Sequence, residues 1–334
     1  MQGNDIVTFT DEEREIYENF CVRLQLEQAD KDIGFERGET FCHLANYISP
    51  HLVGKEWEDI RKSGLLMLVS ETDISKTRHR LHELLIGKPG TGKTELMLWW
   101  RENLQGILIN GEFASKAGLT GDARGKKVTP GLLADYNGNF VLVDELDKMA
   151  IKDQNGLLQA MEEGQYFVVK GKHRTPFTAE IRVIGSTNEI SKIQRPLLDR
   201  FDFVYHCKTA SRAERADNVK RITNSFFGDN EAERVHWLKG YLSWIGDFNP
   251  MREPKCKDSI DHLIEKYIVD RREIEIESVS YRSLEYSILR IAWGIAKLEK
   301  KNVTDTEVFS AIIFKDRILR WLYPEGENSG KKRG

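Results

Sequence analysis

The 334-residue sequence lacks the usual marks of a secreted or membrane protein. Its four cysteines (Cys21, Cys42, Cys207 and Cys256) include no C-x-x-C pair, which argues against a disulfide framework and against a cysteine zinc site. No apolar run approaches the ~20 residues that a membrane span needs. The first residues show neither the basic nor the apolar region of a signal peptide. We therefore expect a soluble intracellular protein without membrane partners, in the cytoplasm or nucleoid, or in the nucleus of a eukaryote.

A large net charge of either sign is also absent. Lys and Arg total 50 against 53 Asp and Glu, a formal net charge of -3. This near-balance excludes a histone-like polycation, and a hydrophobic content of 40% excludes an acidic disordered chain. The acidic excess is confined to residues 1–40, where a capping-box pattern at Thr10–Glu13 opens an amphipathic helical pattern. We expect residues 1–44 to form an acidic helical segment that packs on the main domain.

Short aliphatic runs alternate with helical patterns between about residues 45 and 225. Such alternation indicates a parallel sheet covered by helices on both faces. We therefore predict an α/β fold for this region, with strands at the following runs: Leu84–Ile86, Ile107–Ile109, Phe140–Val143 and Val183–Gly185.

The sequence predicts helices for the remainder of the chain. Residues 226–257 form a helical connection that ends in a linker with Pro250 and Pro254. Residues 258–323 carry apolar side chains at helical spacing and predict a small C-terminal helical domain, and residues 324–334 are expected to be a flexible tail.

One contiguous motif points to nucleotide binding. It matches G-x-x-x-x-G-K-[ST] in full, follows the run Leu84–Ile86 and precedes a helical stretch, which is the context that a phosphate-binding loop requires. Backbone N–H groups of such a loop face phosphate oxygens at a helix N-terminus. We expect Lys93 to contact the β- and γ-phosphates of ATP and the Thr94 hydroxyl to ligate Mg²⁺. The motif comprises Gly87, Lys88, Pro89, Gly90, Thr91, Gly92, Lys93 and Thr94.

Two further strand ends carry polar residues suited to ATP hydrolysis. Four apolar residues lead into Asp144 and Glu145, the acidic pair of a Walker B motif. Asp144 is placed to hold Mg²⁺, and Glu145 to polarise the attacking water. The run that ends at Asn188 places a polar side chain where it can reach the γ-phosphate or the water.

Arg200 follows in the segment Leu197–Asp202 at the end of a helical stretch. In a single subunit Arg200 is a surface charge. In a ring it reaches the neighbouring subunit's γ-phosphate and stabilises the charge of the transition state.

Taken together, these motifs resemble those of AAA+ ATPases, and more narrowly those of the minichromosome maintenance (MCM) replicative helicases. The resemblance covers roughly residues 40–320. The matching segments are Asp144–Met149 (DELDKM), Ala117–Thr120 (AGLT), Leu198–Asp202 (LDRFD), Arg282–Glu285 (RSLE) and the stretch from Met161 to Asn188.

The resemblance implies an AAA+ αβα core with a helical lid, and an ATP-driven ring motor, a hexamer with shared sites, that moves on single-stranded DNA. By position, Asn188 is implied as sensor 1, Arg200 as the arginine finger and Arg282 as sensor 2, with Arg290 as the alternative for the last role. It also implies a helix-2 insert at about residues 113–135 and partners in replication or in a mobile element.

The DNA contacts are expected on a β-hairpin at about residues 165–178. Two β-prone runs flank a basic tip, and basic side chains there suit the phosphate backbone of DNA in a channel. We assign DNA binding to Lys170, Lys172 and Arg174. The alternative is a solvated basic turn.

Other functions remain open. The loop GKPGTGKT is closer to general AAA+ proteins than to the usual MCM form, and no oligonucleotide-binding barrel is apparent before residue 40. The chain is then a minimal motor, a fragment, or a divergent relative. The main alternative is a protein-remodelling ATPase of the MoxR or magnesium-chelatase type. A passive subunit of a mixed ring is disfavoured, because no catalytic position is degraded.

Overall fold

The computed structural model divides the chain into two compact units. We name them the sheet unit and the helical unit. The sheet unit holds the described residues between Ser70 and Ser211 with the first turns of α12 (Tyr281–Leu298) and the end of α13 (Asp305–Leu322), and the helical unit holds the rest. The amphipathic helix expected after Thr10 and the tail expected at 324–334 lie outside the described residues. The structure describes residues 39–52, 54–70, 78–121, 128–170, 173–209, 231–272 and 281–322, with residues 216, 219 and 223.

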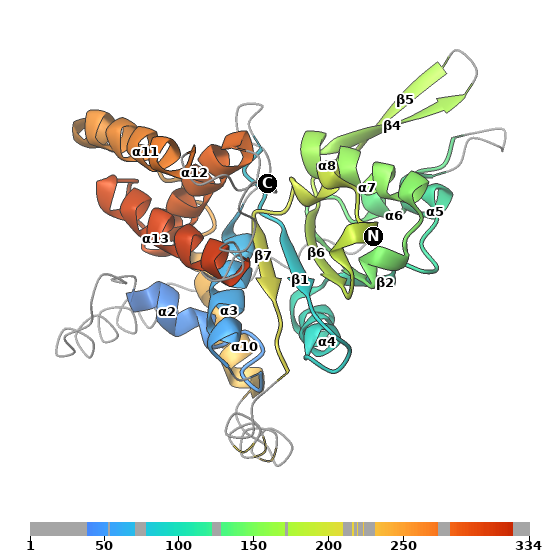
Figure 1. Cartoon of the computed structure of the whole chain (residues 1–334), viewed down its shortest axis with the longest axis horizontal. Coiled ribbons are helices and arrows are strands. Elements are labelled where there is room, and N and C mark those ends of the chain that lie inside the picture. Colours follow the sequence, from blue (N-terminus) through green and yellow to red (C-terminus); the bar gives the residue numbers. More distant parts are fainter. Residues whose placement is uncertain are drawn as a thin grey trace, which may run out of the picture. The chain divides into compact units, whose positions relative to one another are not determined.

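A five-stranded parallel sheet forms the centre of the sheet unit (Figure 1). Its strand order is β2-β3-β6-β1-β7, so β1 lies inside the sheet between β6 and β7. The predicted α/β fold is therefore confirmed, and β7 adds a strand that the sequence analysis did not anticipate. The strands are β1 (Glu83–Ile86), β2 (Ile107–Asn110), β3 (Phe140–Asp144), β6 (Arg182–Thr187) and β7 (Phe203–His206).

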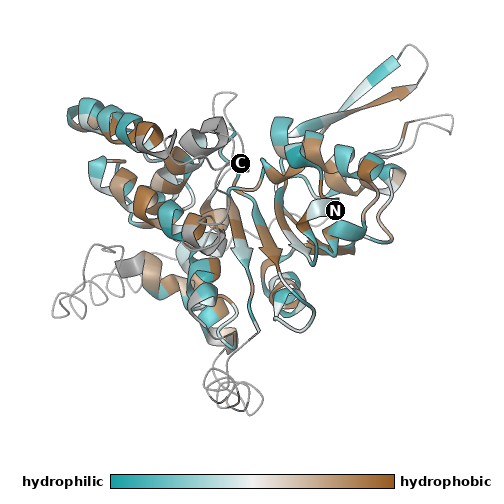
Figure 2. Ribbon diagram, in the orientation of Figure 1, coloured by the Kyte–Doolittle hydropathy of each residue, from teal (hydrophilic) through white to brown (hydrophobic). Residues whose placement is uncertain are grey.

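Burial on both faces explains the aliphatic strands. Val141 and Val143 belong to one apolar cluster with Leu157 of the following helix. Leu142 is on the opposite face, and a Cβ atom at Gly106 would lie 3.0 Å from its Cδ1. A parallel sheet covered on both sides needs continuous apolar runs, not alternating ones. In Figure 2 the strands of the sheet contain hydrophobic stretches, whereas hydrophobic and hydrophilic residues alternate along the helices of the sheet unit.

Helices and a separate hairpin complete the sheet unit. The hairpin is antiparallel, pairs β4 (Gln165–Lys170) with β5 (His173–Thr178), and projects beyond the neighbouring helices (Figure 1). The helices are α4 (Lys93–Leu104), α5 (Lys116–Thr120), α6 (Leu132–Asp135), η1 (Leu146–Lys148), α7 (Ile151–Glu163), η2 (Ile190–Lys192) and α8 (Arg195–Leu198).

The helical unit is built on close helix contacts. A Cβ atom at Gly294 would lie 2.9 Å from Leu66 Cδ2, so α12 and α3 approach closely at this glycine. A capping box begins the final helix, because Glu307 Oε2 accepts hydrogen bonds from the Thr304 amide at 2.9 Å and from its hydroxyl at 2.6 Å. The elements are α2 (Glu39–Ala45), α3 (Lys55–Val69), α10 (Glu231–Trp244), η3 (Pro254–Cys256), α11 (Lys257–Arg272), α12 (Tyr281–Leu298) and α13 (Asp305–Leu322).

The domain boundaries expected from the sequence stay a prediction. By its contacts α3 belongs to the helical unit, although its residues fall within the region 45–225 expected to form the ATPase core. Of the expected helix-2 insert, α5 and α6 are described and residues 122–127 are not. Among the helices of the described residues, none has the length and apolar character to cross a membrane.

Candidate ATP-binding site

The phosphate loop connects β1 to α4 and has the backbone that its glycines permit. Gly92 precedes α4 with φ of 92°, in the left-handed region that favours glycine. At Gly87 the constraint is space, because a Cβ atom there would lie 2.5 Å from the Cys207 carbonyl oxygen. The loop therefore directs its backbone toward the N-terminus of α4, where unpaired N–H groups attract anions.

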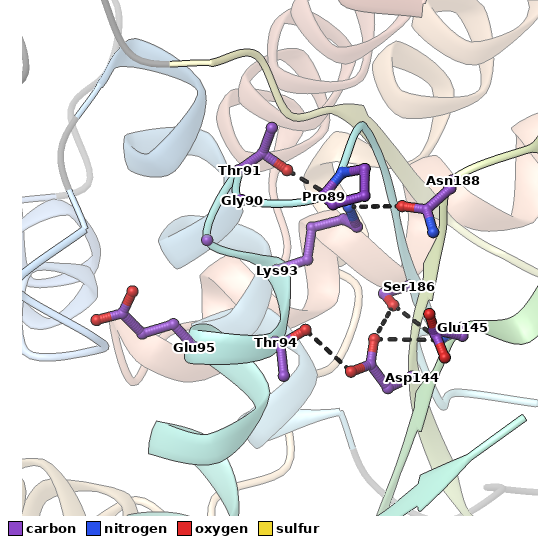
Figure 3. Close-up of a pocket in the computed structure, with 11 residues that line it drawn as sticks. Pro89, Gly90, Thr91, Lys93, Thr94, Glu95, Asp144, Glu145, Ser186 and Asn188 are labelled. Carbon is purple, nitrogen blue, oxygen red and sulfur yellow. Dashed lines mark hydrogen bonds between the residues drawn. The ribbon is translucent and has the colours of Figure 1, made fainter.

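The carboxyl ends of three neighbouring strands meet beside this loop. Ile86 of β1 pairs in register with Thr187 of β6, and Val143 of β3 pairs with Gly185 of β6. Parallel strands end at the same edge, so residues distant in sequence converge there. The result is a pocket of about 330 Å³ (Figure 3), within the size range of small-molecule sites. Its lining residues are Pro89, Gly90, Thr91, Gly92, Lys93, Thr94, Glu95, Asp144, Glu145, Ser186 and Asn188.

Lys93 is buried against the loop that it follows. Its Nζ donates to the carbonyl oxygens of Gly87 at 2.5 Å and Lys88 at 3.0 Å, and it lies 3.3 Å from Asn188 Oδ1. Burial lowers the pKa of the Lys93 ammonium, while the carboxylates of the site, Asp144 among them, act in the opposite direction. A buried cation held by neutral carbonyls gains strongly from an anionic ligand.

Asp144 and Thr94 form a pair suited to a magnesium ion. Thr94 Oγ1 donates to Asp144 Oδ2 at 2.9 Å, and Ser186 Oγ donates to the other carboxylate oxygen. Hydroxyl and carboxylate oxygens are the hard ligands that Mg²⁺ prefers, and the ion keeps several waters besides. These residues therefore fit a magnesium ion at the edge of the phosphate loop.

Glu145 is held by side chains on both of its carboxylate oxygens. Lys148 Nζ lies 2.9 Å from Oε1, and Asn110 Nδ2 donates to Oε2 at 3.1 Å. Hydrogen bonds from Lys148 and Asn110 lower the pKa of the Glu145 carboxyl, which is thus ionised at neutral pH. The backbone of Glu145 has φ of 54°, a left-handed conformation that is uncommon for glutamate. The left-handed backbone conformation and the contacts with Lys148 and Asn110 hold the Glu145 carboxylate at the pocket.

Asn188 completes the pocket from the end of β6. Besides the approach of its Oδ1 to Lys93, its backbone N–H donates to Asp147 Oδ1 at 3.3 Å. The structure thus brings together Lys93, Thr94, Asp144, Glu145 and Asn188, as expected from the sequence. Their roles in binding and catalysis remain predictions.

Arg200 lies apart from these residues. It is not among the residues that line the described pocket, and its Nη2 is 2.6 Å from Glu162 Oε1 of α7. Within the described part of the chain, Arg200 Nε has no hydrogen-bond acceptor. Arg282 lies in α12, but its side chain is outside the described residues.

The predicted DNA contacts fall on the described hairpin only in part. Lys172 is outside the described residues, and Lys170 is described only by its backbone pairing with His173. Arg174 was expected at the tip but lies within β5, because pairing continues to Lys170 and His173. Its guanidinium carbon lies 3.7 Å from the centroid of the Phe167 ring.

The sequence analysis did not single out Asn110, Lys148 or Glu162. Asn110 pairs in register with Asp144 across the sheet, which carries it to Glu145. Asn110 could have been found in the sequence as a polar residue that directly follows the aliphatic run Ile107–Ile109. Lys148 was visible as a cation three residues after Glu145, close enough to pair with it.

The chain is similar in sequence to proteins of one family. A family model described as the MCM P-loop domain matches residues 33–225. The DNA replication licensing factor MCM5 of Arabidopsis thaliana is 23% identical over 78% of the chain and 41% of that protein. The licensing factor MCM7 of Oryza sativa subsp. indica is 28% identical over 86% of the chain and 44% of its own length.

A third relative has a name that refers to an activity. The probable DNA helicase MCM9 of Oryza sativa subsp. indica is 24% identical over 72% of the chain and 39% of that protein. The chain thus spans less than half the length of these curated relatives.

Proposed function

Because the chain belongs to the MCM P-loop family, we propose that it is an ATPase that couples hydrolysis to movement on single-stranded DNA. The observation that carries this proposal is the convergence of Lys93, Thr94, Asp144 and Glu145 on one pocket at the phosphate loop. The pocket provides a cation for phosphate, oxygen ligands for Mg²⁺ and an ionised carboxylate for water.

In this proposal the phosphate loop binds the triphosphate of ATP. Backbone N–H groups at the start of α4 meet the phosphate oxygens, and Lys93 exchanges its carbonyl partners for the β- and γ-phosphates. Thr94 and Asp144 hold Mg²⁺, which when bound neutralises charge on the phosphates. Ser186 fixes the Asp144 carboxylate from the neighbouring strand.

In this proposal, hydrolysis requires a hydrogen bond between the Glu145 carboxylate and the attacking water molecule. The carboxylate polarises the water and accepts one of its protons, while the water oxygen forms a bond to the γ-phosphorus and the bond from that phosphorus to the bridging oxygen of ADP breaks. The products are ADP and inorganic phosphate. Lys148 and Asn110 each donate to one carboxylate oxygen, and a lone pair on each oxygen is left to accept from the water.

We further propose a ring in which subunits share their sites, a hexamer by resemblance. Arg200 of one subunit then supplies positive charge to the γ-phosphate held by its neighbour. Its partial exposure, 25% of the side chain, supports this role, and Arg200 is not among the residues that line the described pocket of its own chain. Arg282 is proposed as a second cation at the shared site.

DNA is proposed to bind along the β4–β5 hairpin, through Lys170, Lys172 and Arg174. The names of the relatives, two replication licensing factors and a probable helicase, favour DNA over the protein-remodelling alternative. From the names of the same relatives we also propose that the protein acts together with other proteins in DNA replication.

The test is ATP hydrolysis with and without single-stranded DNA, measured beside DNA binding at several salt concentrations. We expect DNA to stimulate turnover, and each lost phosphate contact in Lys170→Ala or Lys172→Ala to reduce the salt slope by about one. The effect should be alike for unrelated DNA sequences, since backbone contacts carry no base code. An unchanged DNA affinity and salt slope in the double variant would count against the DNA motor and leave protein remodelling as the leading alternative.

A further inference from the structure

The β4–β5 hairpin has an exposed face on which a guanidinium lies over an aromatic ring. The register pairs Phe167 with Pro176 and Val169 with Arg174, so these four side chains share one face of the hairpin. Arg174 Cζ is 3.7 Å from the centroid of the Phe167 ring. Val169 is 62% exposed, Arg174 and Pro176 are exposed, and Phe167 is half-buried.

This apolar face is not the one that attaches the hairpin to the protein. The opposite face carries Tyr166 and Val168, which belong to the apolar cluster of the sheet unit, and the Tyr166 hydroxyl accepts from the Gly131 amide at 3.2 Å. Packing of the hairpin is therefore complete without Phe167 and Val169. The exposed Val169 and the half-buried Phe167 are therefore accessible to a ligand that covers apolar and aromatic atoms.

We propose that the face formed by Phe167, Val169 and Arg174 binds the bases of single-stranded DNA by stacking. A nucleobase lies against the Phe167–Arg174 pair, while the cations of the hairpin meet the phosphates on either side. The inference rests on the proposed function, since it concerns the same hairpin and the same strand of DNA.

The composition of the hairpin favours nucleic acid as the occupant. Residues 165–178 contain no Asp or Glu, and they contain Lys170, Lys172, His173 and Arg174. Proteins that hold single strands without sequence preference combine such cations with aromatic side chains on which the bases stack. An acidic peptide would use the cations but leave the ring and Val169 uncovered.

Stacking and phosphate contacts make different demands on the ligand. Phosphate contacts require only the charged backbone, and they respond to salt. Stacking requires that bases be present, whatever their identity, because every base has a flat π-face. A strand without bases therefore separates the two contributions.

The experiment measures affinity of the full chain for two fluorescent strands of equal length, oligothymidylate and an oligomer of abasic sites. We expect the wild type to prefer the strand with bases by about 5- to 140-fold, the range for one stacked base. Phe167→Leu keeps apolar volume but loses the ring, and it should remove most of this preference. Phe167→Trp should keep it. Arg174→Lys keeps the charge but loses the planar group, and it should reduce the preference without changing the salt slope.

Phe113→Leu is the matched control, because Phe113 is an exposed aromatic residue (83%) outside the hairpin. Its preference should equal that of the wild type. Thermal unfolding of each variant shows whether the fold is intact.

Each other outcome overturns the inference. Equal affinity of the wild type for both strands, or an unchanged preference in Phe167→Leu, contradicts stacking but leaves the proposed DNA motor standing. Binding of polyglutamate as tight as that of oligothymidylate would indicate a purely electrostatic surface. A failure to bind either DNA strand would contradict the proposed function as well.

Discussion

The guanidinium of Arg200 is paired with the carboxylate of Glu162 in its own chain, with Nη2 and Oε1 2.6 Å apart. Glu162 belongs to the last turn of α7, and Arg200 follows α8. Arg78 fixes the same region, because its Nη1 donates to the carbonyl oxygens of Met161 and Arg200, both at 3.4 Å. A side chain that is to act in a neighbouring subunit must first leave Glu162.

The Glu162 contact should therefore restrain turnover. The pair is partly exposed, and such pairs are worth about 0.2–1 kcal/mol, so we expect Glu162→Gln to raise ATP turnover by up to about fivefold. The assay is steady-state phosphate release per subunit at saturating ATP. Glu163→Gln removes the same charge one residue later and should leave the rate unchanged. A lower rate in Glu162→Gln would instead mean that Glu162 positions Arg200 for the reaction.

Sharing of sites between subunits can be tested by mixing inactive variants. Arg200→Ala should bind ATP and fail to hydrolyse it, since the transition state loses a positive charge. Mixing it with Glu145→Gln should restore part of the activity, because some interfaces then contain an intact pair. Full activity of Arg200→Ala alone, or full turnover by a strictly monomeric chain, would remove the finger assignment.

Variants of Lys93 and of Glu145 should differ in which step they impair, ATP binding or ATP hydrolysis. Glu145→Gln keeps the residues that bind nucleotide and should lose turnover by about two orders of magnitude or more, because water is no longer polarised. Lys93→Ala should weaken ATP binding itself. Equilibrium binding of a fluorescent ATP analogue, measured beside turnover, separates the two defects. Identical behaviour of both variants at saturating ATP would show that the roles are not separate.

Asn110 should limit the reactivity of Glu145. Asn110→Ala removes a hydrogen bond that lowers the pKa of Glu145, so the carboxylate becomes a stronger base toward the water. Hydrogen bonds to charged groups are worth about 1.5–3 kcal/mol, less when water can replace them, so we expect DNA-independent turnover to rise by about two- to tenfold. Asn103→Ala, which removes a side-chain amide on α4, is the control. A fall in turnover would mean that Asn110 orients Glu145 productively.

Lys297 should make the helical unit more stable at alkaline pH. Burial lowers the pKa of Lys297 to about 8 from 10.5, although its Nζ donates to the Gly246 carbonyl at 3.0 Å. Between these values the unfolded chain binds more protons than the folded chain, so the free energy of unfolding rises with pH. Relative to Lys297→Met, the wild type should gain at most roughly 3 kcal/mol over this window.

Urea unfolding at a series of pH values, followed by tryptophan fluorescence, measures this gain. Lys266→Met, which alters an exposed lysine of α11, should show no such pH-dependent difference from the wild type. A constant difference between the wild type and Lys297→Met from pH 8 to pH 10.5 would contradict the expectation.

Features encoded in contiguous segments could be predicted from the sequence. The phosphate loop is one such feature, because its glycines and the flanking strand and helix define its backbone locally. The buried strands are another, since aliphatic runs such as Phe140–Val143 need two covering layers. The capping box at Thr304 and Glu307 is equally local.

Features that depend on strand register could not be predicted in the same way. The contact of Asn110 with Glu145 requires β2 to lie beside β3 in one particular register. The Glu162–Arg200 pair joins segments that no local pattern connects. The position of Arg174 within β5 depends on how far the hairpin pairing extends, and basic residues near a turn do not specify that.

The interior position of β1 also affects how the protein is made. Its neighbours in the sheet are β6 (Arg182–Thr187) and β7 (Phe203–His206), both synthesised long after Glu83–Ile86. The phosphate loop therefore leaves the ribosome well before the strand that will carry Asn188 into its pocket. Such non-local pairing slows folding relative to helical segments and leaves strand edges exposed meanwhile. A product that terminates between Thr94 and Thr187 contains the complete phosphate-loop motif but lacks Asn188, one of the residues that line the pocket.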